Sequence, residues 1–499
     1  AEGHRMSVLF GGMYGTLENC FFDVDVTFNT AWMAYGAAPI WGLADTSVVR
    51  NTVFYIPNAS GLRCIVATEY GKEYEKKGMF DNVAYIYGNP GYDGHTMLPP
   101  VYHPNLKNIH AAVADSANGI FKDFRKLNET KYEAGAAENA NSKDYWDPVT
   151  ASDITAAMSG FTFTEKALKY GEKTIFDFNR IINVSNAEEL VSAMNDKPWA
   201  NIELTRDIDM TDYLSANPWD SETDAFFNKT FSGTLDGKGH SILNLKSTAG
   251  MIIRSTNVVF KEIAASGTIK NLHLQAELSV KDGSDGGGQA RGVLIGFMNG
   301  TLENCFFEVN AQFDVAWKMY GGAPIYDLSK TSVVRNCVFF IPTANGLRTI
   351  RIGGEKGTFE NVTYVYQDFG FKNCALPDAY TPNLTNIYAV SIGKDGIIAG
   401  FKKLNETYTT SGNNESFWSD SSAEEVNGTM NGLTVTNTTL KFGETLVYDR
   451  TAPIKVGEAE SLVSVMNDKP WANIELTQDI DMTDYLAANP WNNNEAFFT

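Results

Sequence analysis

The stretch GTLENCFF at residues 300–307 decides how the chain is read, because the same eight letters stand at residues 15–22, 285 positions earlier. Other runs return in the same order, among them MNDKPW at residues 194–199 and 466–471. Matching segments in a fixed order at a long spacing indicate a tandem array, here with a unit of about 275 residues. The 499 residues start and stop at different points of the unit, so we expect them to be one section of a longer protein.

A shorter pattern recurs inside the unit: an apolar residue, any residue, Asn, and then alternating apolar residues. This alternation is the period of a β-strand. One such strand every 25 to 33 residues is typical of the stacked coils of a parallel β-helix. Stacked Asn amides can hydrogen-bond from coil to coil, and Asn tolerates the left-handed conformation that bends one strand into the next. The pattern predicts a structural ladder of Asn19, Asn51, Asn82, Asn108, Asn244, Asn271, Asn304, Asn336, Asn361 and Asn386.

A β-sandwich with Asn in its turns is the alternative fold. Sandwiches usually space their strands at about 8–12 residues with hairpin turns, and the sequence shows no regular series of hairpin signals. We therefore expect an all-β chain of tandem right-handed parallel β-helices, a solenoid, with short capping helices and small β linkers.

Each stack of coils is expected to begin with a helix. Residues 185–195 read as a short capped helix with acidic residues in its first turn, and residues 201–210 alternate like a first strand. A helix over the open end protects backbone groups that would otherwise template aggregation. The expected domains are 1–144, the C-terminal coils of a first unit; 145–182, a short β linker or cap; 183–416, a complete second unit; 417–455, a second linker or cap; and 456–499, the N-terminal cap and first coil of a third unit.

The run GVLIGFMNGTLENCF at residues 292–306 resembles the GLUG motif of bacterial surface proteins. That motif is rich in Gly around an apolar pair, followed by an apolar-x-Asn-Cys strand. Residues 231–242 resemble the coil that often precedes it, while the first copy departs by placing Ser7 where Gly292 stands. The resemblance covers the coil-forming parts of the unit. It implies an extracellular parallel β-helix, and it implies no single chemistry.

Charge and composition exclude several classes of protein. The chain has 60 acidic and 40 basic side chains and a formal net charge of −20. Nucleic-acid binders usually carry a basic patch, so neither nucleic acid nor an anionic membrane surface is an expected partner. No apolar run approaches the roughly 18 residues that a membrane-spanning helix needs, so we expect no membrane insertion within these residues. Hydrophobic residues make up 43% of the chain, which is enough for a sizeable core.

Parallel β-helices include polysaccharide-degrading enzymes, so paired carboxylates need attention. Glycoside hydrolysis uses two carboxylates that flank the scissile bond. The strand period puts two acids of the TRDIDMTD run on one face, but beside the cap a solvated turn is the expected role. Calcium bound by such carboxylates is the only cofactor that the sequence leaves open. The acids concerned are Asp207, Asp209 and Asp212, which recur as Asp479, Asp481 and Asp484.

Histidines and cysteines give no sign of a metal site or a catalytic triad. None of the six His residues recurs in the other copy or shows ligand spacing. Cys305 and Cys337 each follow a ladder Asn, so we expect both to point into the interior. Small buried thiols are the expected state, and a disulfide between stacked neighbours is the alternative.

A group of aromatic residues around Pro39 recurs around Pro324, between two ladder strands, and is expected to lie in a loop on the flank of the stack. Sugars and proteins stack on aromatic faces of this kind. The alternative is that the rings pack on the coil beneath them. The candidate binding residues are Trp32, Tyr35, Trp41, Trp317, Tyr320 and Tyr326, with Arg63 and Arg348 as polar neighbours.

We expect a non-enzymatic cell-surface stalk or adhesin, extracellular or secreted, in which no residue is catalytic. Its expected partners are a glycan or a host or cell-surface protein, besides neighbouring repeats of the same protein. A structural subunit of an extracellular filament and a polysaccharide-degrading β-helix enzyme are the alternatives.

Overall fold

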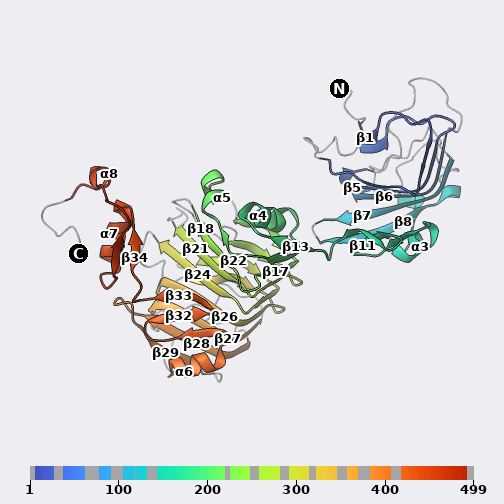
Figure 1. Cartoon of the computed structure of the whole chain (residues 1–499). Coiled ribbons are helices and arrows are strands. Elements are labelled where there is room, and N and C mark those ends of the chain that lie inside the picture. Colours follow the sequence, from blue (N-terminus) through green and yellow to red (C-terminus); the bar gives the residue numbers. More distant parts are fainter. Residues whose placement is uncertain are drawn as a thin grey trace. The chain divides into compact units, whose positions relative to one another are not determined.

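The computed structural model describes residues 6–26, 37–61, 78–90, 105–116, 118–131, 143–219, 225–247, 258–280, 291–313, 322–345, 357–368, 383–405 and 417–491. Within these ranges the protein is mostly β-strand with a few short helices (Figure 1). The chain divides into two compact units, Ala1–Arg180 and Ile181–Thr499.

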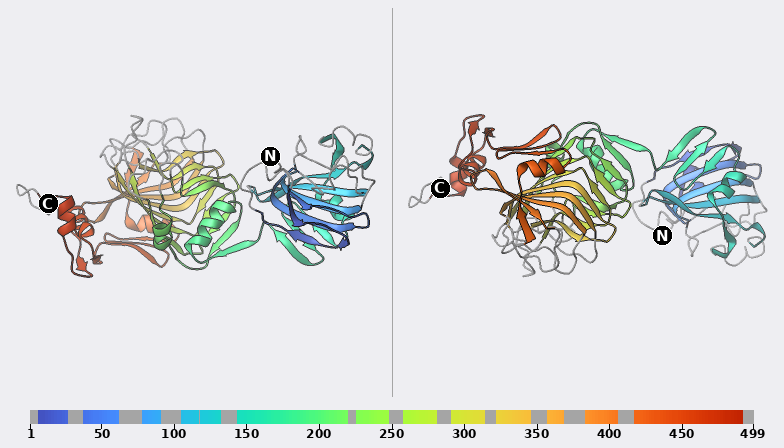
Figure 2. Two further views of the ribbon diagram at one scale, coloured as in Figure 1. Left: turned by 90° about the horizontal axis from the view of Figure 1, so that it is seen from above. Right: turned by 90° about the horizontal axis from the view of Figure 1, so that it is seen from below.

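Residues 181–392 form strands in three parallel columns, and from Asn201 to Leu328 the chain visits the columns in the same order each time. One visit to all three is called a coil here. The strands lie side by side in both views of Figure 2. The first column contains β13 (Ile181–Val184), β14 (Asn201–Leu204), β17 (Thr234–Asp236), β20 (Thr268–Lys270), β23 (Thr301–Glu303), β26 (Val333–Asn345), β27 (Thr358–Asp368) and β28 (Asn383–Ile392). The second contains β15 (Ile208–Asp209), β18 (Ser241–Lys246), β21 (His273–Val280), β24 (Phe306–Phe313) and the second half of β26. The third contains β16 (Phe227–Phe231), β19 (Phe260–Ile263), β22 (Arg291–Met298) and β25 (Gly322–Leu328).

The core lies between the columns because every strand turns alternate side chains inward. In the first column Ile202, Leu235, Ile269, Leu302 and Val334 stand in register, and all five are fully buried. Stacking like on like buries apolar surface without gaps, which is the main favourable term in folding.

Aromatic rings continue this stacking in the second column of both units. Phe307 and Phe339 stack with ring centroids 5.6 Å apart, and Phe339 stacks on Tyr364 at 5.4 Å. In the first unit Phe54 stacks with Phe22 and with Tyr85, at 5.5 Å in both cases. Such ring pairs contribute about 0.5–1.5 kcal/mol beyond their buried area. The two copies therefore share the packing of their cores as well as their amino-acid sequence.

A ladder Asn bends the chain from the first column into the second. All ten predicted Asn residues have a left-handed backbone, with φ between 45° and 58°. Asn51 donates from Nδ2 to Oδ1 of Asn19 at 2.7 Å, and Asn386 donates in the same way to Asn361 at 3.0 Å. Asn304 does so to Asn271 at 3.3 Å. The left-handed corner and the amide stack thus occur together in both units.

Asn244 does not belong to this ladder, so that part of the prediction is wrong. It lies inside β18 of the second column, at a shift in register, and its Nδ2 donates to Oδ2 of Asp209 at 2.9 Å. The rung before Asn271 is Asp236, whose Oδ1 accepts from Asn271 Nδ2 at 3.0 Å. A carboxylate accepts an amide hydrogen bond as well as another amide does, so the ladder continues without Asn at this rung.

The predicted cap is α4 (Ala187–Asp196), whose N-cap Asn186 accepts a hydrogen bond from the backbone of Glu189. Its buried residues Leu190 and Met194 join the core of the unit. The prediction of one strand over residues 201–210 is wrong, because β14 ends at Leu204 and β15 begins at Ile208. The intervening turn separates two strands that lie in different columns.

Each stack ends where the chain reverses direction. β29 (Ile398–Leu404) pairs antiparallel with β28, and β30 (Trp418–Asp420) pairs antiparallel with β29. Trp146 and Trp418 are buried in the cores of their units, although residues 145 and 417 were expected to begin the linkers. Ile181 and Ile182, expected in the first linker, lie in β13. The linkers proper are therefore shorter than the sequence indicated.

Each linker is a helix followed by a three-stranded antiparallel sheet. These are α3 (Ala151–Ala157) with β10 (Phe161–Phe163), β11 (Ala167–Tyr170) and β12 (Lys173–Asp177), and α6 (Ala423–Thr429) with β31 (Leu433–Val435), β32 (Thr439–Phe442) and β33 (Thr445–Asp449). The second linker packs on the outer face of the second column, where Phe442 contacts Phe306 and Tyr448 contacts Phe340. It is also bonded to the ladder, since Asn336 exchanges two hydrogen bonds with the backbone of Asn431.

The unit Ala1–Arg180 repeats the later part of this arrangement. β1 (Met6–Phe10) pairs in parallel with β4 (Ala37–Ile40). β2 (Thr16–Glu18) and β3 (Phe21–Asp23) pair with β5 (Val48–Ser60), followed by β6 (Met79–Asn89) and β7 (Asn105–Asp115), all in parallel. β8 (Ile120–Leu127) and β9 (Trp146–Pro148) then close the sheet antiparallel. A second cap follows the second linker, with β34 (Ile454–Val456), α7 (Ala459–Asp468), β35 (Ile474–Leu476) and α8 (Thr483–Ala488).

Candidate binding face

Two members of the predicted aromatic set lie within the described residues, Tyr326 in the third column of the second unit and Trp41 in the first unit. Tyr326 lies on β25 with a half-buried ring, in a T-shaped contact with Phe297 of β22 at a centroid separation of 6.4 Å. In the first unit Trp41 directly follows β4, and its backbone N–H donates to the carbonyl of Phe10 at 2.7 Å. The Trp41 side chain is 40% exposed. Aromatic surface is therefore presented at equivalent positions of both copies.

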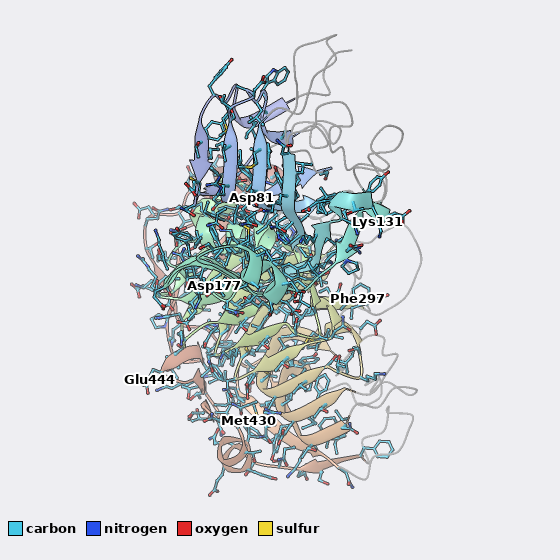
Figure 3. The ribbon with its side chains drawn as sticks, turned by 90° about the vertical axis from the view of Figure 1, so that its right-hand side faces the viewer. Asp81, Lys131, Asp177, Phe297, Met430 and Glu444 are labelled. Carbon is cyan, nitrogen blue, oxygen red and sulfur yellow. The ribbon has the colours of Figure 1, made fainter. Side chains whose placement is uncertain are left out.

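The second linker packs on a different face of the second unit. Figure 3 labels Phe297 and the linker residue Glu444, which lie on opposite flanks of the unit. This agrees with the packing of the linker on the second column, against Phe306 and Phe340. We call the outer surface formed by Phe297 and Tyr326 in the second unit, and the equivalent surface around Trp41 in the first unit, the aromatic face of each unit.

Two carboxylates flank Phe297 on the same row of the third column. Glu262 stands in register with Phe297 on one side and Asp327 on the other. Glu262 accepts hydrogen bonds from Thr230 Oγ1 and Asn299 Nδ2, both at 2.9 Å, which fix the direction of its oxygens. Oriented carboxylate oxygens accept from hydroxyl groups, and an adjacent ring offers apolar contact. This combination suits a polyhydroxylated ligand with an apolar C–H face.

The other predicted binding residues lie outside the described residues. They therefore stay predictions: Trp32, Tyr35, Trp317, Tyr320, Arg63 and Arg348. Sequence reasoning missed Phe297, Glu262 and Asp327. The first copy has Gly12 at the position of Phe297, so repetition gave no signal for it. Glu262, Phe297 and Asp327 can be recognised as neighbours only when the register between coils is known.

The paired acids near the first cap make local structural hydrogen bonds. Asp209 Oδ1 accepts from the hydroxyl and the backbone N–H of Thr211, at 2.6 and 2.9 Å. These hydrogen bonds hold the pKa of Asp209 below its ordinary value, whereas a glycosidase acid needs a raised pKa. Asp207 Oδ1 accepts from the backbone of Ser241 at 2.8 Å. Asp212 lies in the first turn of α5 (Thr211–Ala216), where it favours the helix dipole.

A buried polar contact in the second column was not expected from the sequence. Ser241 Oγ and His273 Nδ1 lie 3.1 Å apart on neighbouring strands, and both residues are buried. His273 Nε2 lies 3.6 Å from Glu308, which also accepts from Gln275 at 3.2 Å. Spacing in the sequence could not reveal this group, because loops of different length separate its members.

Cys305 and Cys337 are buried free thiols, as predicted, and Cys20 is a third free thiol. Cys305 and Cys337 are fully buried, and Cys20 is half-buried. Burial raises the pKa of the Cys337 thiol well above its ordinary value. Cys64 and Cys374 lie outside the described residues. Within the described part of the chain, no group of three or more His, Cys, Asp or Glu side chains is arranged to hold a metal ion.

One protein-family model matches residues 181–304, with the description "Putative pectate lyase-like adhesive domain". The match begins at the first residue of the second unit and ends at the ladder residue Asn304. It covers less than half of the chain, so it characterises one segment. No curated protein and no solved structure shows significant similarity to the chain. Among the helices of the described ranges, none has the length and apolar composition needed to cross a bilayer.

Proposed function

We propose that the chain is part of an adhesin-like extracellular surface protein whose units are right-handed parallel β-helices. The observation that carries this proposal is the match to an adhesive domain over the first coils of a unit that the chain repeats. Three parallel columns visited in constant order support the solenoid. The resemblance of residues 292–306 to the GLUG motif of bacterial surface proteins supports the proposed extracellular location.

The proposed ligand is a glycan, bound at the aromatic face, and Trp32 and Trp317, which precede β4 and β25 in sequence, stay predicted contributors to the same site. Trp41 offers ring surface in the first unit, and Phe297 with Tyr326 offers it in the second, beside Glu262. Repetition of the face within one chain favours avidity, because a second site then binds at a high effective concentration. A weak contact per unit is therefore enough for firm attachment.

The experiment that tests the proposal is a glycan array probed with the full chain, followed by analysis of the bound glycans for cleavage. We expect retention of one class of glycan without release of reducing ends. Absence of binding on the array and on intact cells would remove the adhesive function.

A polysaccharide-degrading enzyme is the second candidate, because the matched family is described as pectate lyase-like. Release of sugar products that is lost in both Asp207→Asn and Asp209→Asn would replace binding by catalysis as the function. Asp481 is a control within the same chain, because its carboxylate accepts the same two hydrogen bonds from Thr483. Asp481→Asn should leave activity at Asp207 and Asp209 unchanged.

A further inference from the structure

The turn that joins β28 to β29 is hydrogen-bonded to the second linker. Tyr448 of β33 donates its hydroxyl to the carbonyl of Gly396 in this turn at 2.7 Å. Arg450, just after β33, donates from Nε to the carbonyl of Asp395 at 2.7 Å. Two hydrogen bonds to backbone carbonyls therefore join the β28–β29 turn to the second linker. The turn and the linker form one continuous surface.

Trp471, which lies between α7 and β35 of the second cap, packs on this surface. The Arg450 guanidinium lies 5.5 Å from the centre of the Trp471 ring, within the range of a cation–π contact. The Tyr448 ring lies 6.3 Å from the Trp471 ring in a T-shaped arrangement. Because Arg450 Nε is already bonded to a carbonyl, its guanidinium plane is held in place before the indole packs on it.

The backbone conformation of Gly396 and its lack of a side chain allow Trp471 to approach closely. The φ of Gly396 is +74°, a conformation that side chains disfavour, and a Cβ at this position would lie 2.5 Å from the Trp471 ring. Burial raises the pKa of Tyr448 to about 12, so its hydroxyl remains a donor at neutral pH. The β28–β29 turn, the second linker and the Trp471 indole therefore pack closely against one another.

We propose that Gly396, Tyr448 and Arg450 form a docking surface for the N-terminal cap of the next repeat, anchored by Trp471. The occupant is the segment 454–491 of this chain, and the surface holds one repeat against the next. The proposal does not depend on glycan binding. The first copy has Phe176 and Phe178 where the second has Tyr448 and Arg450, and both rings pack on Phe121 of their own unit. The two joints of the chain therefore differ chemically.

Hydrogen–deuterium exchange of the full chain tests this proposal through the amides of α7. The double variant Tyr448→Phe and Arg450→Phe installs the residues of the first joint, which the linker sheet already tolerates. We expect exchange in α7 to rise about tenfold, from the loss of two hydrogen bonds and a cation–π contact. Trp471→Ala should give a similar rise. Leu446→Ala, an exposed residue on the same strand, is the matched control and should give no change.

Unchanged exchange of α7 in Trp471→Ala would overturn the proposal. If the double variant also accelerates hydrogen exchange in β31–β33, the Trp471→Ala variant still tests the docking proposal. Trp471 lies outside the linker sheet, so its replacement leaves that sheet intact. Equal acceleration in Leu446→Ala would show general loosening of the linker, and it would overturn a specific docking surface.

Discussion

Asn336 donates a hydrogen bond from Nδ2 to Oδ1 of Asn304 at 2.7 Å, from one coil to the coil before it. Both residues have φ near 50°, so each forms the corner between two columns and the rung of a ladder at once. Asn336 also exchanges hydrogen bonds with Asn431 of the linker. One buried side chain therefore joins two coils and the linker.

Replacement of Asn336 should separate these two roles. Asn336→Ala removes the amide bonds and forces a side chain into the left-handed region, at a combined cost of about 3 kcal/mol. Asn336→Gly removes only the bonds and should cost about 1 kcal/mol less. Native-state hydrogen exchange of β26 and β27 measures both changes. Equal destabilisation by Ala and Gly would show that the left-handed corner contributes nothing.

Two equivalent glycines test the stacking of coils. A Cβ on Gly300 would lie 2.2 Å from the carbonyl oxygen of Gly267 in the preceding coil, whereas a Cβ on Gly15 would meet nothing within 4 Å. Gly300→Ala should therefore destabilise the second unit by about 2 kcal/mol or more, through overpacking. Gly15→Ala should be close to neutral. Thermal unfolding followed by circular dichroism compares the two, and similar losses for both would contradict the stacking described for these residues.

The first unit should lose stability in mild acid because of His110. His110 is buried with both ring nitrogens unbonded, and burial, aided by Lys126 and opposed by Asp153, lowers its pKa to about 4. The unfolded chain binds this proton near pH 6.5. Stability is therefore fully present above pH 6.5 and falls as the pH drops towards 4, by up to about 3 kcal/mol.

The second unit supplies the matched control for His110. Tyr388 stands at the equivalent position, and its hydroxyl lies 3.0 Å from Thr429 Oγ1. The double variant His110→Tyr with Ala157→Thr should remove the acid sensitivity of β7 in hydrogen exchange between pH 7 and 4. Persistence of the same pH slope in that variant would assign the sensitivity to other groups.

Much of the fold could be predicted because Asn marks most of the corners between the first and second columns. Asn at a left-handed position fixes where a strand ends, and the apolar residues beside it fix which face is buried, as at Leu302 and Val334. The Asn244 prediction failed because Asp236 fills the same rung, and a search for Asn alone cannot recognise a carboxylate that accepts the same bond.

The candidate site could be predicted only in part. Repetition revealed Trp41 and Tyr326, since both copies carry a ring there. Phe297 and Glu262 meet through the register of coils that are separated by loops of unequal length, and no spacing in one sequence determines that register. The Ser241–His273 contact was missed for the same reason.

The buried thiols give a further test of the core. Native protein treated with a thiol reagent should be labelled at Cys20 well before Cys305 and Cys337, because burial blocks access and keeps Cys337 protonated. Peptide mass spectrometry locates the label, and urea should expose all three cysteines. Rapid labelling of Cys337 in the native state would show that the interior of the second unit is open.

The affinity of the full chain for a glycan identified on the array, compared among wild type, Trp41→Ala and Tyr170→Ala, tests the central claim most directly. Trp41 and Tyr170 are 40% and 41% exposed, but Tyr170 lies on β11 of the linker sheet and is not part of the aromatic face. We predict that Trp41→Ala weakens binding about tenfold and that Tyr170→Ala leaves it unchanged, as expected for an aromatic residue at the centre of a binding surface. Equal affinity of all three proteins would contradict adhesion through the aromatic face.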